Sequence, residues 1–469
     1  MSKIEVNQIS SQCGSTLTVG QSGDTVTLAA GATQTGFGRT GTVDWDTTAK
    51  TTGFTAVSGV GYFVNTTSGA ITVTLPATPS AGDIVSIADY TNTFQTNNVT
   101  VARNGSPIGG VSADAILSTE GQSVTFIYVD ATEGWKNVQD STSNVIGNAF
   151  LVATGGTITE CGNFKIHTFT GPGTFSVSQT AVCSSDNVLD YLVVAGGGAG
   201  GGPSGSDSAG SGGGGAGGFR ISNATCMPAP LTSPLANPTG ITATVSSFPI
   251  TVGAGGSPST PSGPYGGGNG NNSIFSTIIS TGGGGGGANP NAPEPLRSGQ
   301  PGGSGGGAGR SPAATTGGTG NTPPVSPPQG NNGGIGNYGP TNYGQGGGGG
   351  ASAAGNVATG ASPTVGGSGG AGSFVAGSGF ANCNGTPGPV CGARYFAGGG
   401  GGSTYQGGTA GPGGVGGGGA GNFSPNNAAS PGISGVSGTT NSGGGGGGMS
   451  QLGTGGAGGS GIVIIRYKF

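Results

Sequence analysis

Charged side chains are scarce in this chain of 469 residues, which has 12 Lys and Arg, 16 Asp and Glu, and a net charge of −4. Proteins that bind nucleic acid gather Lys and Arg to neutralise phosphates, so nucleic acid is disfavoured as a natural partner. Lysine is absent between Lys165 and Lys468, and beyond Asp207 the only acidic residue is Glu294. Solvated disordered chains usually carry high net charge, so something other than charge repulsion must keep this chain folded or soluble.

Histidine is almost absent too, because His167 is the only one. This excludes zinc sites built from several histidines, and any nucleophilic triad would have to use His167. We expect His167 on a strand face shared with Lys165 and Phe169, either exposed or in a cross-strand pair. Asp44 and Asp46 could in principle cut glycans, but two acids two residues apart are far more often solvated. Walker A and CxxC patterns are missing as well, so we expect no catalytic residue, metal or cofactor.

Long apolar runs and aromatic residues are also few. Only 32% of residues are hydrophobic and 6% aromatic, so cores must be small and local, which argues against a large single-core enzyme. No run approaches the roughly 18 apolar residues of a membrane span, and the opening MSKIEV lacks the apolar region of a signal peptide. We expect synthesis in a cytoplasm and no membrane insertion.

Glycine is what the chain has in excess. Its 115 Gly and 29 Pro together make up 144 of 469 residues, about 31%. Residues 1–190 contain 23 of the glycines and residues 191–469 contain the other 92. The chain therefore joins two regions of different physical character.

The first region has the alternation of β-strands and no convincing helical periodicity. Residues 1–40 have too few apolar side chains for a core of their own, so we expect an amino-terminal trimeric attachment segment there. A small β module should follow over 41–147, bracketed by Trp45 and Trp135, and then a β-hairpin connector over 148–190. Strands are predicted at residues 16–19, 25–28, 71–75, 83–87, 99–101 and 124–129.

The connector contains a hairpin pattern in which two β-rich runs, 165–170 and 174–177, flank Gly171-Pro172-Gly173. Pro172 lies midway between Cys161 and Cys183, so these cysteines would face each other across the hairpin and could form a disulfide. Cys383 and Cys391 enclose a short loop and are a second possible pair. Cytoplasmic synthesis favours thiols in both cases.

In the second region, 191–469, runs of consecutive glycine lie between predicted strands at 190–194 and 461–467, with further strands at 248–252 and 273–279. Collagen is excluded because the runs lack a strict Gly-X-Y repeat, and a flexible linker would not usually contain strands. Consecutive glycine can adopt polyproline II, which has three residues per turn and no internal hydrogen bonds. We predict packed polyglycine II rods that bond to each other, stable only as a cooperative array.

These residues resemble those of a known family. Tyr191 to Gly198, Val252 to Gly256 and Gly459 to Tyr467 are similar to the glycine-rich domain of bacteriophage tail-fibre proteins, especially those of marine phages. Thr66 to Asp83 and Tyr128 to Trp135 are similar to the β module that often precedes it. More distantly, the glycine-rich part resembles the polyglycine-sandwich adhesins of T-even-type fibres. The resemblance implies an all-β, elongated trimer whose inter-rod loops bind a host receptor, but it assigns no binding residue.

Aromatic side chains beside the glycine runs are candidates for receptor contacts, because rings together with neutral hydrogen-bonding groups suit sugars and outer-membrane protein loops. The alternative is that several of them only cap the ends of the lattice. The candidates are Tyr338, Tyr343, Arg394, Tyr395, Tyr405 and Phe423.

We therefore expect a non-enzymatic virion fibre or adhesin that attaches through its amino terminus to phage tail or baseplate proteins and binds a host glycan or outer-membrane protein. One alternative is a head fibre or capsid decoration protein. The other is an extracellular glycine-rich structural protein of a cell, which would explain the glycine but not the β modules.

Overall fold

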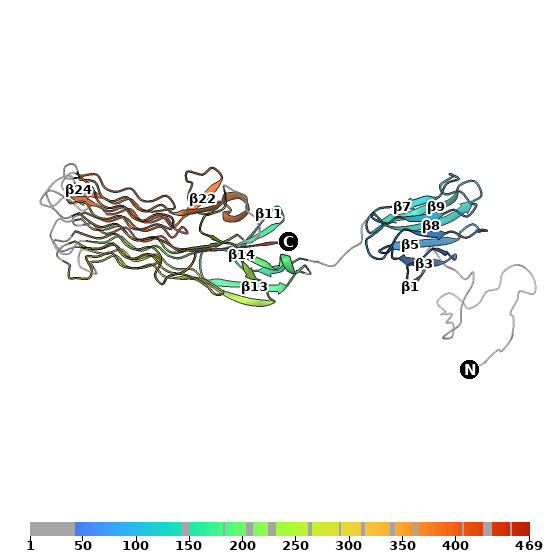
Figure 1. Cartoon of the computed structure of the whole chain (residues 1–469), viewed down its shortest axis with the longest axis horizontal. Coiled ribbons are helices and arrows are strands. Elements are labelled where there is room, and N and C mark those ends of the chain that lie inside the picture. Colours follow the sequence, from blue (N-terminus) through green and yellow to red (C-terminus); the bar gives the residue numbers. More distant parts are fainter. Residues whose placement is uncertain are drawn as a thin grey trace, which may run out of the picture. The chain divides into compact units, whose positions relative to one another are not determined.

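The computed structural model describes residues 43–141, 150–181, 183–202, 210–223, 231–260, 265–289, 292–310, 315–337, 343–360, 364–405, 408–424, 434–450 and 453–469. The chain divides after Gly147 into two compact units (Figure 1). Regular structure in the described residues is almost entirely β, as the sequence predicts. The expected attachment segment 1–40, with its strands at 16–19 and 25–28, lies outside the described residues.

The amino-terminal unit is a β-sandwich. One sheet has the order β1-β3-β5-β8-β9 and the other β2-β4-β6-β7, and side chains of both sheets share one core around Trp135. The predicted strands at 71–75, 83–87, 99–101 and 124–129 are confirmed as β4, β5, β6 and β8. The strands are β1 Asp44–Lys50, β2 Phe54–Thr55, β3 Val60–Val64, β4 Ile71–Thr74, β5 Ile84–Asp89, β6 Val99–Ala102, β7 Ala115–Leu117, β8 Ser123–Asp130 and β9 Gly134–Ser141.

The second unit is organised around two adjacent antiparallel strands, β14 and β25, which come from the start and the end of the glycine-rich region. Both are apolar on both faces: Leu192 and Ile464 belong to one core, whereas Val193 and Val463 belong to another. The largest sheet has the order β11-β12-β25-β14-β15-β16, and β17 pairs with β14. A second sheet, β10-β13-β18-β19-β20, and two-stranded pairs β21-β22 and β23-β24 complete the strands of the described residues.

The bounds of these elements are β10 Val152–Thr154, β11 Thr157–Cys161, β12 Phe164–Phe169, β13 Gly173–Gln179, β14 Val188–Val194, β15 Phe219–Ser222, β16 Ala236–Asn237, β17 Ile241–Thr242, β18 Ser246–Thr251, β19 Ser273–Phe275, β20 Ile278–Ser280, β21 Ser373–Ala376, β22 Ala393–Phe396, β23 Thr404–Tyr405, β24 Phe423–Ser424 and β25 Ile462–Lys468. Two single turns, η1 Ser184–Asp186 and η2 Gly377–Ala381, lie between them. The strand predicted over 273–279 is two strands, because Ser276 turns the chain with a φ of 52°.

The hairpin predicted on either side of Pro172 is wrong. β12 pairs with β11 and β25, whereas β13 pairs with β10 and β18 in the other sheet. The described strands between residues 150 and 190 therefore belong to the second unit rather than to a separate connector. Pairing with β25 places Val463, Ile464 and Ile465 beside β12, whereas the local turn offers the less apolar strand β13.

Neither predicted disulfide is formed, and the Cys161–Cys183 pair depended on that hairpin. Cys161 lies opposite Phe164, across the β11-β12 turn, and Cys183 forms a hydrogen bond with Ser185. Cys383 and Cys391 also carry free thiols, so neither proposed disulfide is present in the structure.

The glycine runs form the predicted rods. Backbone N–H groups of the run 212–217 donate to other runs, and the partner run repeats every third residue. Gly212 and Gly215 donate to Gly287 and Gly284 of one run, which gives the threefold period of polyglycine II. With the acceptor bonds included, this run has six neighbours, namely residues 195–201, 284–287, 304–307, 346–349, 443–446 and the run containing Gly400.

Close packing explains why the rods need glycine. A β-carbon built on Gly213 would overlap the carbonyl oxygen of Gly400, and one on Gly214 would overlap that of Gly198. Where rods reach the apolar core they carry alanine instead, as at Ala216. At the edge of the lattice asparagine side chains replace a missing rod. Asn269 and Asn272 accept hydrogen bonds from the N–H groups of Gly285 and Gly282 at 2.8 and 2.9 Å.

Candidate functional site

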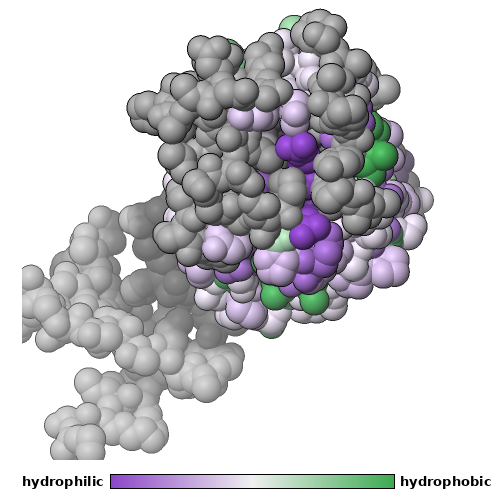
Figure 2. Space-filling model, turned by 90° about the vertical axis from the view of Figure 1, so that its left-hand side faces the viewer, coloured by the Kyte–Doolittle hydropathy of each residue, from purple (hydrophilic) through white to green (hydrophobic). Residues whose placement is uncertain are grey.

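The glycine-rich unit has two different ends (Figure 1). At one end the rods continue into strands, among them β14, β15, β22 and β25. At the other end lie β23 and β24. We call this the loop end. Figure 2 looks onto it, and its coloured surface is mainly white to purple, with the most hydrophilic residues near the middle.

An aromatic cluster with a cation lies at the loop end. The rings of Tyr343 and Tyr405 meet edge to face with centroids 5.4 Å apart. The Arg310 guanidinium lies over the ring of Tyr343, with its Cζ 4.3 Å from the ring centroid. Tyr405 is only 8% exposed, whereas Tyr343 and Arg310 are half-buried. Tyr405 therefore supports the cluster from below, and Tyr343 and Arg310 form its accessible part.

The backbone holds this cluster in place. Gly344 and Thr404 form an antiparallel bridge, so the residues beside them, Tyr343 and Tyr405, are brought together. The Gln345 side chain donates to the Tyr343 carbonyl at 3.0 Å. Each of these residues borders a glycine rod, so the position of the rings follows from the packing of the lattice.

Phe423 also lies at the loop end. It is 43% exposed and its backbone is paired with that of Thr404 on the neighbouring strand. Nearby, the Oγ1 of Thr404 and the Oε1 of Gln345 are buried without a hydrogen-bond partner among the described residues. Tyr338, another candidate for receptor contact, lies outside the described residues.

Arg394 and Tyr395 do not belong to this cluster. Both lie on β22 at the strand end of the unit (Figure 1). Tyr395 is 6% exposed, packs on Phe374 with centroids 5.4 Å apart, and its hydroxyl accepts from the Val390 N–H at 3.3 Å. Its role is to close the strand end of the lattice. The sequence could not separate the two groups, because successive rods run in opposite directions and their loops alternate between the ends.

The buried Asp190–Arg466 ion pair and the buried His167 both have structural roles. The ion pair was not predicted from the sequence. Asp190 and Arg466 form a cross-strand ion pair at 3.0 Å between β14 and β25, with side chains 0% and 3% exposed. Of the two alternatives expected for His167, the structure shows the cross-strand one. Its ring is fully buried and stacks on that of Tyr467 on β25 with centroids 5.5 Å apart, and its Nδ1–H donates to the Gly155 carbonyl at 2.7 Å. A lone acid and a lone base within the two framing apolar strands were the signal that could have revealed the ion pair.

Within the described ranges, no group of three or more His, Cys, Asp or Glu side chains could hold a metal ion. The described residues likewise contain no helix long and apolar enough to span a bilayer.

The architecture defines an all-β protein that carries a lattice of polyglycine rods ending in loops. A family model described as a glycine-rich domain matches residues 168–468, well over half of the chain, and the chain belongs to this family. A search of curated proteins finds no match.

Proposed function

We propose that the chain is a structural virion fibre, a tail fibre or adhesin, which binds a host-surface receptor through the loop end of its glycine-rich unit. The observation that carries the proposal is the cluster of Arg310, Tyr343 and Tyr405 at the tip of a rod lattice. Inner rod positions such as Gly213 and Gly214 have no room for a β-carbon, whereas surface loops tolerate varied residues, so we assign recognition to the loops.

The chemistry of the cluster suits a host glycan or an outer-membrane protein loop. A tyrosine offers a large ring and a hydroxyl with few rotatable bonds, and an arginine held over its face adds a planar set of donors. Such a site is weak when single and becomes strong when several copies act together. We therefore propose a homotrimer assembled through residues 1–40 and attached there to tail or baseplate proteins. A folded monomer in sedimentation would contradict that assembly.

The test compares two arginines at opposite ends of the lattice. We expect virions carrying Arg310→Ala or Tyr343→Ala to adsorb to host cells at least tenfold more weakly, while the same substitution at Arg394 leaves adsorption unchanged. If Arg394→Ala is the variant that loses adsorption, recognition lies at the strand end. If all three variants adsorb like the parent, the cluster only caps the lattice.

Electron microscopy of virions labelled with an antibody against residues 1–40 would place the chain on the tail or the head. Label on the head surface would favour the alternative of a head fibre or capsid decoration protein.

A further inference from the structure

A second site lies on the amino-terminal β-sandwich, and its residues come from one row across a sheet. Strand pairing places Trp45, Gly61, Ser86, Thr125 and Gln139 side by side on β1, β3, β5, β8 and β9. Because side chains alternate between the faces of a strand, all five residues share the face that points away from the core. The receptor binding proposed for the loop end does not involve this face of the sandwich.

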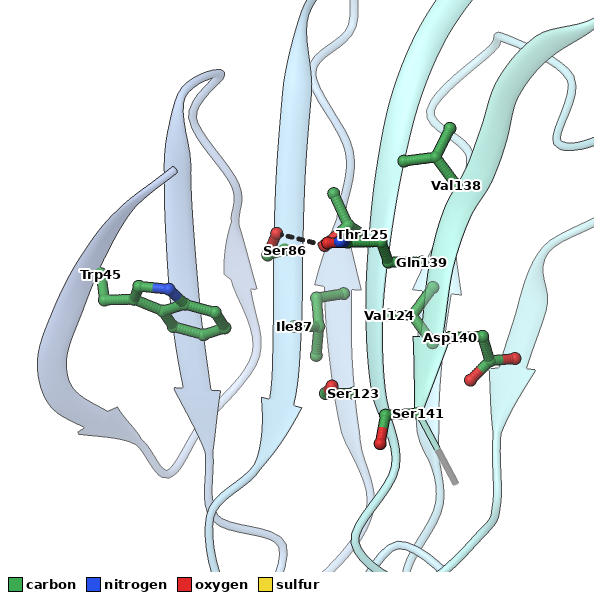
Figure 3. A pocket seen from close by; sticks show the side chains of 10 residues that line it. All are labelled: Trp45, Ser86, Ile87, Ser123, Val124, Thr125, Val138, Gln139, Asp140 and Ser141. Atoms are coloured by element: carbon green, nitrogen blue, oxygen red, sulfur yellow. Dashed lines mark hydrogen bonds between the residues drawn. The ribbon is translucent and has the colours of Figure 1, made fainter. Parts of the chain in front are cut away.

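The row forms a hollow of about 520 Å³, within the range of small-molecule sites (Figure 3). Its floor is low because the middle residues of the row that line it, Ser86 and Thr125, have small side chains. The floor is also polar, since the hydroxyls of Ser86 and Thr125 form a hydrogen bond of 2.7 Å. The Gln139 amide, which is exposed, stands at the opposite side from the indole of Trp45.

The indole of Trp45 is held ready as the wall of the hollow. It lies over Gly61, where any β-carbon would meet the ring at 2.7 Å. Phe63 packs against it with centroids 4.9 Å apart, and Tyr90 backs Phe63 at 6.3 Å. Trp45 nevertheless remains 43% exposed. A large ring that is fixed from behind and open in front is a stacking surface, because little side-chain entropy is lost when a ligand covers it.

The lining selects the chemistry of the ligand. It contains no Lys or Arg, which disfavours phosphates and nucleic acid, and hydroxyl groups make the floor unsuitable for a purely apolar ligand. Its one ionisable member, Asp140, is engaged at the rim by the Gln122 side chain at 3.3 Å. An aromatic wall beside neutral hydroxyl and amide groups fits a ligand with an apolar ring face and a rim of hydroxyls.

We propose that this hollow binds a neutral saccharide, with one hexose ring stacked on Trp45 and its hydroxyls bonded to Thr125 and Gln139. The site is independent of the loop end and of whether the chain is a virion fibre. It would give the chain a glycan contact in its amino-terminal unit.

The test uses the full chain and three probes, namely tetrasaccharides of a glucan, a mannan and a galactan. Tryptophan fluorescence reports on the site, because Trp135 is fully buried and Trp45 is the only other tryptophan. We expect a saturable change with at least one probe and a loss of affinity of at least tenfold in Trp45→Ala, measured by calorimetry. Gln139→Ala, an exposed substitution that does not threaten folding, should weaken binding severalfold.

The matched control is Ile116→Ala, which removes an exposed apolar side chain (62% exposed) from the other sheet and should bind like the parent. No saturable binding of any probe would overturn the proposal, as would equal affinity of the parent, Trp45→Ala and Gln139→Ala. If Trp45→Ala instead lowers the mass seen in sedimentation, the face joins copies of the chain and the saccharide site is rejected.

Discussion

At the scale of single residues, the glycine-rich unit depends on a few polar groups placed in an otherwise apolar centre. The Asp190–Arg466 pair lies on the face of β14 and β25 that also carries Leu192 and Ile464, and Ser222 donates to Asp190 at 2.8 Å. The Arg466 guanidinium also lies 4.4 Å from the ring centroid of Phe164 and 4.9 Å from that of Phe380. Burial lowers the pKa of Arg466, and the hydrogen bond to Asp190 opposes that shift. The pair is costly to break because either partner alone would be a buried charge.

Asp190→Ala should therefore reduce the free energy of unfolding of the second unit by about 3–5 kcal/mol, the usual cost of leaving a buried charge unpaired. Denaturant unfolding followed by far-UV circular dichroism measures it. Asp186→Ala is the control. Asp186 pairs at 3.2 Å with Lys468, and the two side chains are 16% and 42% exposed, so this pair is far more accessible to water. Solvent-exposed pairs contribute about 0–1 kcal/mol, and we expect an effect near that range. In Asp190→Ala/Arg466→Met much of the loss should be recovered. Equal effects of the two single variants would contradict this account.

His167 gives the second prediction at this scale. Burial lowers the pKa of its imidazole below the ordinary value of 6.5, and the hydrogen bond to the Gly155 carbonyl only partly offsets this. The unfolded chain therefore takes up a proton at a higher pH than the folded chain. Stability should be full above pH 6.5 and fall as the pH drops below it, by at most about 1.4 kcal/mol per pH unit.

Urea unfolding at several pH values from 8 to 5 measures this effect as the difference between the parent and His167→Gln. That difference should shrink as the pH falls, because only the parent carries the buried imidazole. A difference that does not change with pH would show that His167 does not control acid sensitivity.

At the scale of elements, the sequence pattern predicted the rods and part of the strands. It predicted neither strands such as β3, β15 and β22 nor which of the elements pair. The framing strands and the threefold rods follow from apolar runs and consecutive glycine. The partner of β12 does not, because β25 lies almost 300 residues away, as the 300-residue separation of the His167–Tyr467 contact shows. The prediction from the sequence rested only on the local Gly171-Pro172-Gly173 turn, and it therefore paired β12 with β13. Tyr343 lies at the loop end of the unit and Tyr395 at the strand end. Which end a residue occupies depends on the direction of its rod, and no local sequence pattern predicts that direction.

The rods can be tested with a pair of glycines that differ in their surroundings. A β-carbon on Gly284 would overlap the carbonyl oxygen of Gln300, whereas one on Gly171 would meet nothing within 4 Å. Gly284→Val should destabilise the second unit by roughly 1–3 kcal/mol or more, as overpacking does elsewhere, and Gly171→Val should have little effect. Thermal unfolding and amide hydrogen exchange measure both, and Gly285→Val should repeat the result. Unchanged protection in Gly284→Val would mean that the runs behave as linkers.

At the scale of the whole molecule, the second unit is completed by its last strand, β25. β25 pairs with both β12 and β14, and it contributes Ile462 and Ile464 to one core and Val463, Ile465 and Tyr467 to the other. All five side chains are fully buried. The amino-terminal unit has a separate core and depends on none of them.

Removal of residues 462–469 should therefore unfold the second unit and spare the first. Burial of five such side chains is worth about 1.5–3 kcal/mol each, so their sum is comparable to the 5–15 kcal/mol that stabilises a whole domain. Both tryptophans, Trp45 and Trp135, belong to the first unit, so their fluorescence should still report a native environment. Amide hydrogen exchange should show the loss of protection across the glycine rods. Removal of residues 468 and 469 alone is the control, because it keeps the buried strand through Tyr467. Rods that remain protected without β25 would show that the lattice is held by its own hydrogen bonds and needs no closing strand.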